Sequence, residues 1–375
     1  MTQQDLKDLI RVVGDGTGLS KNDLIYPEEL ALAFRNRGLP LEGIRYPVTP
    51  TGMHYLLTHF DIPDVDASSW QLRVHGLVSN EVSLGLEELK GLPKVSLPVT
   101  MECAGNGRAR LNPRPISQPW LLEAVGTAEW GGTPLRGVLE QTGISDDAVE
   151  ILFTGRDEGL QGGEVQLYQR SLTVEEATRD EVLLAYEMNG APLEPQHGYP
   201  LRLIVPSWYG MTSVKWLDSI EAIPRHFDGY QMDQTYRYTV SADRPGEPVT
   251  TIRVRSLMVP PGIPEFLTRT RLVKAGQITV SGRAWAGRQS VSRVEFSDDD
   301  GMSWRDAELG EQVGEFAWIA WSYRWDAKAG RRFLRVRATD SDGNVQPSAQ
   351  PWTLLGMGNN MTQRVEVIVS KPAPC

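Results

Sequence analysis

The last third of the chain consists of short runs in which apolar and polar residues alternate, separated by Asp-Gly and Ser-Asp-Gly turn signals. In the run RRFLRVRATDSDGN, Leu334, Val336 and Ala338 fall on one face of a strand, and arginines fall on the other. Because each such strand has to bury its apolar face against a second sheet, the pattern constrains the fold more than any other feature. It predicts an immunoglobulin-like β-sandwich domain over residues 251–375.

The preceding two thirds of the chain mix strands and short helices with long loops. The run WQLRVHGLV alternates as a half-buried strand does. Thr133 and Gly143 have the positions of an N-cap and a C-terminal glycine around one short helix, and Thr173 and Glu176 have capping-box spacing before another. The absence of a Gly-rich phosphate loop argues against a Rossmann fold. An α+β domain is predicted over residues 46–250.

Composition argues against several classes of partner and location. A formal net charge of −10 speaks against nucleic-acid binding. No stretch reaches the ~20 apolar residues that a membrane helix needs, so no membrane contact is expected. Residues 1–45 are polar, punctuated by Gly and Pro, and lack the features of a secretory signal, which is typical of an N-terminal arm. With an unpaired internal cysteine, these features predict a cytoplasmic protein, or a periplasmic one if a leader has been removed.

The internal cysteine, Cys103, lies in the tract MECAGNGRAR, where small neighbours leave its sulfur open to close approach. The only other cysteine, Cys375, is the last residue. A free cysteine is most often a small buried apolar side chain. A phosphatase-type nucleophile fits poorly, because the spacing to Arg108 is one residue too short and the charge of Glu102 would oppose a thiolate. The third alternative is a ligand to a metal that brings ligands of its own, since one cysteine cannot complete a structural zinc site.

Three tracts carry a resemblance to the sulfite oxidase family of molybdenum-cofactor enzymes, in its bacterial haem-free type: MECAGNGR, PWLLEAVGTAEWGGTPLRGVL and VLLAYEMNGAPLEPQHGYPLRLIVPSWYGMTSVKWLDSIE. The resemblance spans about residues 45–370. It implies an α+β cofactor domain (sulfite oxidase-like) followed by an immunoglobulin-like dimerisation domain. In this family molybdenum is held by the dithiolene of one pterin and by the motif cysteine, so the resemblance implies that Cys103 is the catalytic metal ligand. A soft thiolate suits such a metal.

The resemblance also implies which residues bind molybdopterin, expected here in its mononucleotide form. The matching cofactor-binding positions are His59, Asp157, His197, Arg202 and Lys215. Haem is not expected, because the sequence has no Cys-x-x-Cys-His attachment site. Electrons are therefore expected to leave through an external acceptor, either a cytochrome or a small carrier.

The family's sulfite enzymes surround a small oxyanion substrate with arginines, a tyrosine and a tryptophan. By resemblance, Arg108 is one of these arginines and Trp120 is the tryptophan. Tyr236 is our choice for the tyrosine, with Tyr230 and Tyr238 as alternatives. These residues are expected to act in catalysis together with the cysteine.

Two further arginines of the family pattern are Leu57 and Leu355 in this sequence. Because charge-assisted hydrogen bonds contribute about 1.5–3 kcal/mol each, weaker sulfite binding is expected. The resemblance implies oxidation of sulfite to sulfate by oxygen-atom transfer. Oxygen-atom transfer on another substrate, as in sulfoxide or nitrate reduction, stays open. A fold without cofactor, or an adhesive module, is a third reading, and the intact cysteine motif argues against it.

A homodimer is also expected. The last domain resembles the family's dimerisation domain, and its Trp-rich run FAWIAWSYRW offers apolar surface that one face of a strand does not bury. A twofold dimer with an isologous interface is therefore predicted.

Overall fold

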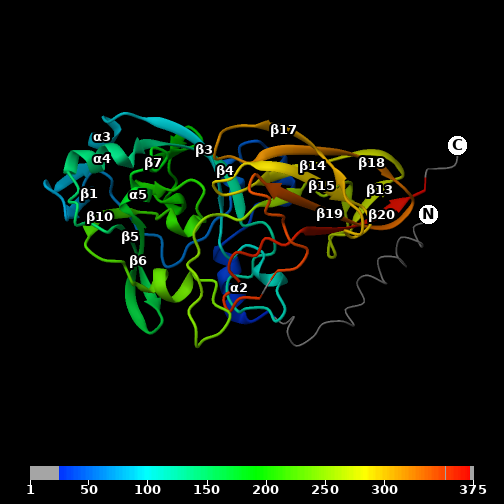
Figure 1. Ribbon diagram of the computed structural model, residues 1–375, viewed down its shortest axis with the longest axis horizontal. Coiled ribbons are helices and arrows are strands. Elements are labelled where there is room, and N and C mark those ends of the chain that lie inside the picture. The colour runs from blue at the N-terminus through cyan, green and yellow to red at the C-terminus, as the bar shows by residue number, and fades with distance from the viewer. Residues whose placement is uncertain (1–24, 351, 372–375) are drawn as a thin grey trace.

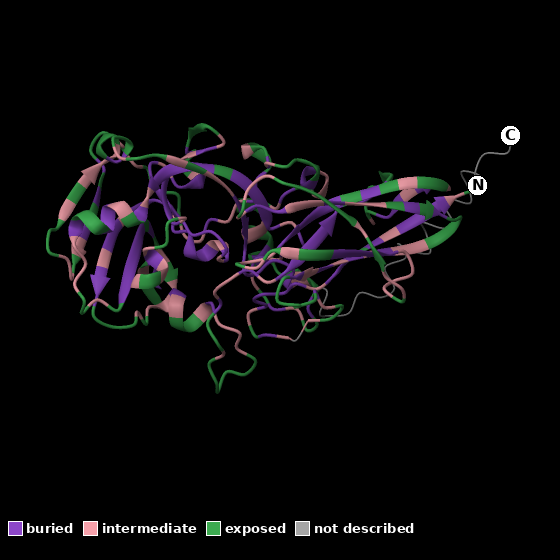
Figure 2. Cartoon of the chain, turned by 45° about the horizontal axis from the view of Figure 1, so that its top comes forward, coloured by how far each residue is buried: buried purple, intermediate pink, exposed green. Residues whose placement is uncertain are grey.

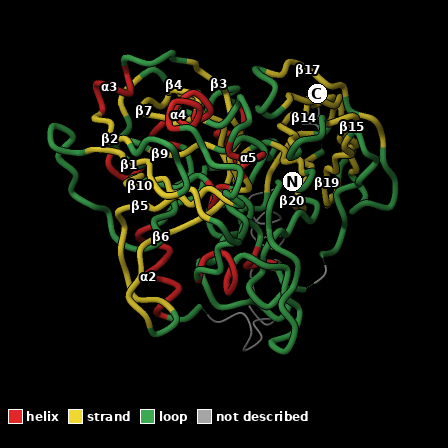
Figure 3. Tube along the Cα trace, turned by 60° about the vertical axis from the view of Figure 1, so that its left-hand side comes forward, coloured by secondary structure: helices red, strands yellow, loops and turns green. Residues whose placement is uncertain are grey.

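The computed structural model describes residues 25–350 and 352–371, and two strand-rich domains divide most of that part of the chain between them (Figure 1). Each domain has its own buried apolar core. Helices are short, and strands and loops make up most of both domains (Figure 3). Cys375 lies outside the described residues. Within the described residues, no helix is both long enough and apolar enough to cross a membrane.

The first domain contains a mixed sheet in the order β2-β1-β10-β5-β6, in which only β1 and β10 run parallel. Leu72 and Val74 of β1 are buried, as the alternation in the sequence predicts. The strands of this sheet are β1 (Gln71–Gly76), β2 (Val82–Gly85), β5 (Glu150–Gln161), β6 (Glu164–Thr173) and β10 (Leu217–Ile223).

A second, antiparallel sheet of the first domain has the order β3-β4-β7-β8, with β9 paired to β7. Its strand β3 ends directly before Cys103, so the sheet fixes where the cysteine loop begins. The strands are β3 (Val95–Glu102), β4 (Val125–Pro134), β7 (Leu183–Met188), β8 (Ala191–Pro192) and β9 (Arg202–Ile204).

Two of the helix boundaries follow the sequence signals, and one does not. The hydroxyl of Thr173 accepts a hydrogen bond from the N–H of Glu176 at 3.2 Å, as predicted, and Gly143 ends a helix with a left-handed φ of 66°. Thr133 is not an N-cap, because it lies in β4 and its hydroxyl donates to the carbonyl of Leu89. The helical segments are α3 (Leu86–Lys90), α4 (Leu135–Thr142), α5 (Val174–Ala177), the 3-10 turns η4 (Arg108–Arg110), η5 (Pro195–His197) and η6 (Gly210–Thr212), and the π-helical turn η7 (Gln231–Thr235).

The second domain is the predicted β-sandwich. Its sheets have the orders β11-β14-β18-β17 and β12-β13-β20-β19-β15-β16. Leu334, Val336 and Ala338 are fully buried between them, on the inner faces that Figure 2 shows as buried. The strands are β11 (Arg255–Met258), β12 (Ile263–Pro264), β13 (Arg271–Lys274), β14 (Gly276–Trp285), β15 (Val291–Ser297), β16 (Arg305–Asp306), β17 (Glu308–Gln312), β18 (Ile319–Ala327), β19 (Gly330–Asp340) and β20 (Gln363–Ser370).

The Trp-rich run of this domain does not offer apolar surface to a partner. Trp318, Trp321 and Trp325 are all buried within the chain. That reason for expecting a dimer was therefore wrong, because the three tryptophans of the run pack within the chain. The large apolar side chains that the second domain does expose include Ile263, Phe266, Leu267 and Met302.

Residues 25–58 cross from one domain to the other. The guanidinium of Arg283 in β14 donates to the carbonyl of Ile44 at 3.2 Å, and the N–H of Thr49 donates to the carbonyl of Thr127 in β4 at 2.7 Å. The segment thus bridges the two domains before it reaches the recess described below. Its helices are α2 (Pro27–Arg35) and the 3-10 turns η2 (Leu41–Arg45) and η3 (Thr51–Met53).

Candidate functional site

Cys103 begins a tight loop at the end of β3. Its N–H donates to the carbonyl of Ala124 at 2.9 Å, and its carbonyl accepts from the N–H of Asn106 at 2.9 Å. A Cβ on Gly105 would lie 2.5 Å from Arg108, so glycine is what allows the guanidinium to lie across the loop. Burial raises the pKa of the Cys103 thiol, and the positive charge of Arg108 opposes that shift.

Gly107 ends the loop in a left-handed conformation, with a φ of 87°, and a Cβ there would lie 2.8 Å from Nδ2 of Asn359. We expect Gly107→Ala to lower the free energy of unfolding by about 1–3 kcal/mol, because it adds backbone strain to a close contact. Urea denaturation measures this change. Gly137→Ala is the matched control, since a Cβ on Gly137 meets nothing within 4 Å. Equal stability of the two variants would contradict the expectation.

A recess with about 670 Å³ of empty space, partly open to solvent, lies beside the loop. Segments that are far apart in the sequence build its wall. They range from residues 54–59, near the N-terminal end of the first domain, to Tyr236, which follows η7. Seven of the predicted site residues line it: His59, Cys103, Asp157, His197, Arg202, Lys215 and Tyr236.

Arg202 brings a buried positive charge to the recess. Its Nη1 donates to the carbonyl of His197 at 3.0 Å and its Nη2 to the carbonyl of Ser213 at 3.0 Å, while the guanidinium lies 4.7 Å from the ring centroid of Trp130. It forms no ion pair with any carboxylate of the described residues. Burial lowers the pKa of Arg202 to about 10, so the side chain is still charged at neutral pH.

Lys215 and Asp157 face the same recess with opposed pKa shifts. The ammonium of Lys215 donates to the carbonyls of Leu57 at 2.9 Å and Gln196 at 3.0 Å. Burial, aided by the charge of Arg202, lowers the pKa of Lys215 to about 7, and burial raises the pKa of Asp157 to about 7. With Arg202 charged as well, the wall carries more positive than negative charge below neutral pH.

Four polar atoms of the recess wall are buried without a hydrogen-bond partner among residues 25–350 and 352–371. They are Nε2 of His54, Oδ1 of Asp157, Nε2 of His197 and Nε of Arg202. Because buried polar groups are nearly always hydrogen-bonded, these atoms indicate a polar ligand in the recess. The charges of Arg202 and Lys215 favour an anionic one. A pterin that carries a phosphate has both features, so the residues present fit the group that the resemblance implies.

His54 is a recess residue that the sequence did not single out. It is buried, and its ring centroid lies 5.9 Å from that of His197, with the planes nearly perpendicular. Burial lowers the pKa of His54 to about 4 and, together with the nearby cations, that of His197 to about 2, so both rings are neutral. A second histidine in the tract MHYLLTH, which already contains His59, was the signal that could have found it.

Of the three candidate tyrosines Tyr230, Tyr236 and Tyr238, Tyr236 lines the recess, together with Tyr55 and Tyr168, which the sequence did not single out. The guanidinium of Arg170 lies 5.4 Å from its ring centroid, and burial raises the pKa of Tyr236 to about 12. Tyr230 and Tyr238 do not lie on the recess wall, and the ring of Tyr238 packs instead against Arg253 at 4.2 Å.

Arg108 and Trp120 lie beside Cys103 but not on the recess wall. Trp120 packs in the same apolar cluster as Cys103. The Nε of Arg108 donates to the carbonyl of Leu355 at 2.7 Å. Leu355 packs against another apolar cluster, and Leu57 packs against the cluster of Cys103. Of the two leucines, only Leu57 lines the recess.

The cofactor-free protein is expected to bind sulfate more weakly as the pH rises through about 7. Lys215 is protonated below its lowered pKa and neutral above it, while Asp157 is neutral below its raised pKa and negative above it. Both changes make the recess less positive, and sulfate keeps its own charge between about pH 5.5 and 9. Titration calorimetry measures the affinity for sulfate at about pH 5.5 and at about pH 9. In Lys215→Met the difference should shrink, and equal affinities in the unaltered protein would contradict this account.

Family models match most of the chain. Residues 59–231 match the oxidoreductase molybdopterin binding domain, and residues 247–370 match the Mo-co oxidoreductase dimerisation domain. The boundary between the two matches falls between the two domains of the structure.

Curated relatives cover nearly the whole chain. The chain is 32% identical to sulfite oxidase from Arabidopsis thaliana over 355 residues, which span 85% of this chain and 87% of that protein. It is also similar to nitrate reductase [NADH] 1 from rice, at 33% identity, and to human mitochondrial sulfite oxidase, at 32% identity. It spans 38% of the length of the rice protein and 62% of that of the human protein.

The fold is also found in a solved structure. The sulfane dehydrogenase SoxCD from Paracoccus pantotrophus matches with a TM-score of 0.76 at 22% sequence identity, covering 94% of this chain and 91% of that chain. At this level of identity the match describes the arrangement of both domains and not the substrate.

Proposed function

We propose, since this chain belongs to the sulfite oxidase and nitrate reductase family of molybdopterin-binding oxidoreductases, that it oxidises sulfite to sulfate. The reaction transfers one oxygen atom that comes from water and releases two protons and two electrons. A bound molybdenum cofactor supplies the oxygen-atom transfer and accepts the two electrons. One observation carries the proposal: Cys103, buried cations and polar atoms without a partner among the described residues all lie on one recess wall.

We assign the residues of the recess to two tasks. Cys103 would hold the metal through its thiolate, which metal binding deprotonates despite the raised pKa of the thiol. The charges of Arg202 and Lys215 would bind the phosphate of the molybdopterin, which we propose to be the mononucleotide form. The remaining partners of the pterin would be His59, Asp157 and His197, which all line the recess. Oδ1 of Asp157 and Nε2 of His197 have no hydrogen-bond partner among the described residues, whereas Nε2 of His59 lies 3.0 Å from Oε1 of Gln161.

The substrate would be held by the groups around Cys103. Arg108 keeps its positive charge close to the sulfur, which favours an oxyanion there. Tyr236 stays protonated at neutral pH because burial raises its pKa to about 12, so its hydroxyl can donate a hydrogen bond to a bound anion. Trp120 packs against Cys103 and limits the access of water from that side.

Electrons would pass one at a time to a separate acceptor, a cytochrome or a small carrier. We propose the haem-free type within the family. The printed sequence contains no Cys-x-x-Cys-His motif for covalent haem attachment. We propose that the protein is cytoplasmic, or periplasmic if a leader has been removed, and the free Cys103 supports a reducing compartment.

Sulfite-dependent reduction of ferricyanide by the purified holoenzyme tests the proposed activity. We expect sulfate as the product, with two ferricyanide ions reduced per sulfite. A preparation that contains the cofactor but fails to oxidise sulfite would contradict the proposal.

Oxygen-atom transfer in the reducing direction is the second candidate, and Leu57 is the observation that favours it. Leu57 lines the recess, and an apolar residue at that position suits a substrate with less charge than sulfite. Oxidation of a reduced viologen by nitrate or by a sulfoxide, measured on the same preparation, separates the two candidates.

The protein is expected to form a homodimer, since its second domain matches a family dimerisation domain. Light scattering should report a particle of twice the 41.7 kDa chain across micromolar concentrations. The exposed pair Phe266 and Leu267 is a candidate contact. A particle of 41.7 kDa over this range would contradict the expectation.

A further inference from the structure

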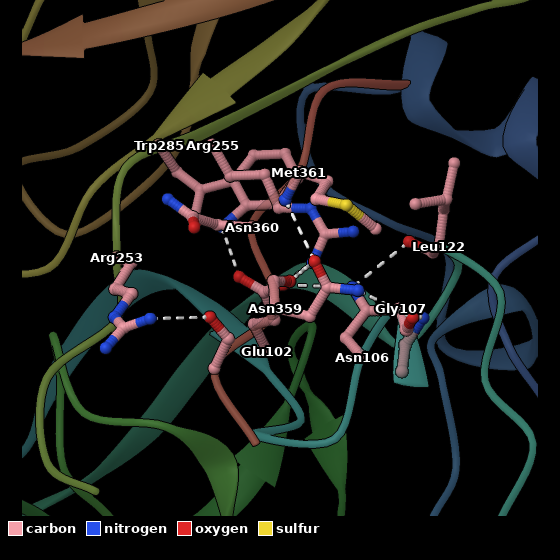
Figure 4. A network of polar contacts seen from close by, with 12 residues as sticks. Glu102, Asn106, Gly107, Leu122, Arg253, Arg255, Trp285, Asn359, Asn360 and Met361 are labelled. Carbon is pink, nitrogen blue, oxygen red and sulfur yellow. Dashed lines mark hydrogen bonds and ion pairs between the residues drawn. The ribbon is translucent and has the colours of Figure 1, made fainter. Parts of the chain in front are cut away.

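A buried polar network joins the cysteine loop to the second domain (Figure 4). Its centre is the carboxylate of Glu102, the residue directly before Cys103, and Glu102 is only 1% exposed. Nη1 of Arg255, in β11, lies 2.5 Å from one oxygen of this carboxylate, and Nε1 of Trp285, in β14, donates to the other at 2.7 Å. These two partners of the carboxylate belong to the second domain.

The same network holds the loop at several points along its length. Nδ2 of Asn106 donates to the carboxylate of Glu102 at 2.9 Å, and Oδ1 of Asn106 accepts from the N–H of Ala124 at 3.1 Å. Nδ2 of Asn359, from the second domain, donates to the carbonyl of Gly107 at 2.7 Å. The loop is therefore fixed before its cysteine, in its middle and at its end.

The segment that carries Asn359 adds two further contacts from the second domain. The N–H of Gly358 donates to the carbonyl of Ala104 at 2.7 Å, and the carbonyl of Asn359 accepts from Nη1 of Arg255 at 2.9 Å. Arg255 is thus hydrogen-bonded to both sides of the contact between the domains. None of these groups lines the recess wall, so they contact the loop away from the recess.

A gain in stability alone does not explain why the ion pair of Glu102 and Arg255 is buried. Arg255 is 0% exposed and Glu102 is 1% exposed, so both charges are removed from water. The desolvation of a buried ion pair offsets much of its Coulombic attraction, and an apolar pair of similar volume is often no less stable. The best-attested role of buried ion pairs is to fix one conformation among several, and here the segment they fix carries the cysteine.

We propose that Glu102 and Arg255 are positioning residues, through which the second domain holds the loop so that the Cys103 sulfur faces the recess. The second domain then serves the site of the first domain as well as dimerisation. The inference rests on the proposed function only for the identity of the ligand that the sulfur meets. The conformation of the loop is defined without that ligand and can be measured in cofactor-free protein.

Hydrogen exchange of the loop amides in cofactor-free protein tests the proposal. Glu102→Gln leaves Arg255 buried without a counter-charge, so we expect the amides of residues 103–107 to exchange about tenfold faster or more. The amides of β7 should keep their rates, because the change is local. Arg255→Gln should act in the same way. The double variant Glu102→Gln/Arg255→Gln should return the loop toward the original rate, since no uncompensated charge remains.

Glu295→Gln is the matched control. Glu295 is 4% exposed and forms a bidentate pair with Arg337 at 2.7 and 3.1 Å, also in the second domain but away from the loop. Glu295→Gln should lower the free energy of unfolding and leave the exchange rates of the loop amides unchanged. Loop exchange at the original rate in Glu102→Gln, or a rise matched by β7, would overturn the proposal. If that variant fails to fold, Asn359→Ala decides, because it removes a loop contact without touching a charge, and unchanged exchange there would overturn it too.

A spectroscopic readout on the loaded enzyme separates positioning from general stability. The absorption band that arises from charge transfer between a cysteine sulfur and its metal depends on the geometry of that bond. We expect the band to shift in Glu102→Gln and to keep its place in Glu295→Gln, and an identical band in all three proteins would overturn the proposal. Protein that contains no molybdenum would count against the proposed function and leave the exchange experiment intact.

Discussion

Cys103→Ser is expected to abolish sulfite oxidation while the protein stays folded. A hydroxyl is a poor replacement for a thiolate as a ligand to a soft metal, and loss of a direct ligand should exceed the roughly 10–100-fold loss that outer partners of a metal ligand cause. The fold should survive because serine and cysteine differ little in size. The loop also keeps its hydrogen bonds to Glu102 and Asn359. The measurement is kcat for sulfite at saturating acceptor, together with the pterin content.

The pterin content is what makes this result specific to the metal ligand. Arg202 and Lys215 are unchanged in Cys103→Ser, so the variant should still retain pterin. Cys375→Ser is the matched control, since it makes the same chemical change at the chain terminus and should keep full activity. Turnover by Cys103→Ser at the original rate would contradict the assignment of Cys103 as the metal ligand.

Leu57→Arg is expected to raise kcat/KM for sulfite by about tenfold to a hundredfold, which corresponds to one charge-assisted hydrogen bond of about 1.5–3 kcal/mol. Leu57 lines the recess and is only partly buried, so a guanidinium there can reach a bound anion without losing all contact with water. An uncharged substrate should not gain from the change. Initial rates for sulfite and for a sulfoxide, measured on both proteins, check this.

Leu355→Arg should behave differently, which provides the comparison. Leu355 packs against an apolar cluster that contains Trp285 and Met357, and its backbone carbonyl accepts a hydrogen bond from Arg108. An arginine there would be partly buried without a partner, so we expect lower stability and no gain for sulfite. A gain of equal size from both variants, or none from Leu57→Arg in a stable protein, would refute the different placement of the two leucines.

The β-sandwich could be predicted from sequence because its signal is local. The alternation of Leu334, Val336 and Ala338 with arginines records which face of one strand is buried, and the structure buries those three residues. The cap formed by Thr173 is also local, since it involves the N–H of Glu176 three residues away. Thr133 failed as a cap because pairing of β4 with its neighbours outweighed the local preference.

The arrangement of the site depends on contacts that no local pattern records. Arg108 and Leu355 are 247 positions apart, and Glu102 and Arg255 are 153 positions apart. A family pattern could mark Leu355 as a substrate position, but only packing shows that its side chain turns into an apolar cluster. Likewise the sequence suggested that Trp318 is exposed, whereas it contacts the distant segment around Pro47, whose carbonyl accepts a hydrogen bond from its Nε1.

We propose above all that the recess beside Cys103 holds a molybdenum cofactor. Elemental analysis of the purified protein by inductively coupled plasma mass spectrometry, with the protein concentration taken from amino-acid analysis, tests it most directly. We expect about one molybdenum per chain, because one cysteine of the described residues, Cys103, lines the recess. Protein that is expressed in a host able to make the cofactor, and that carries no molybdenum or a stoichiometric amount of another metal, would contradict the account.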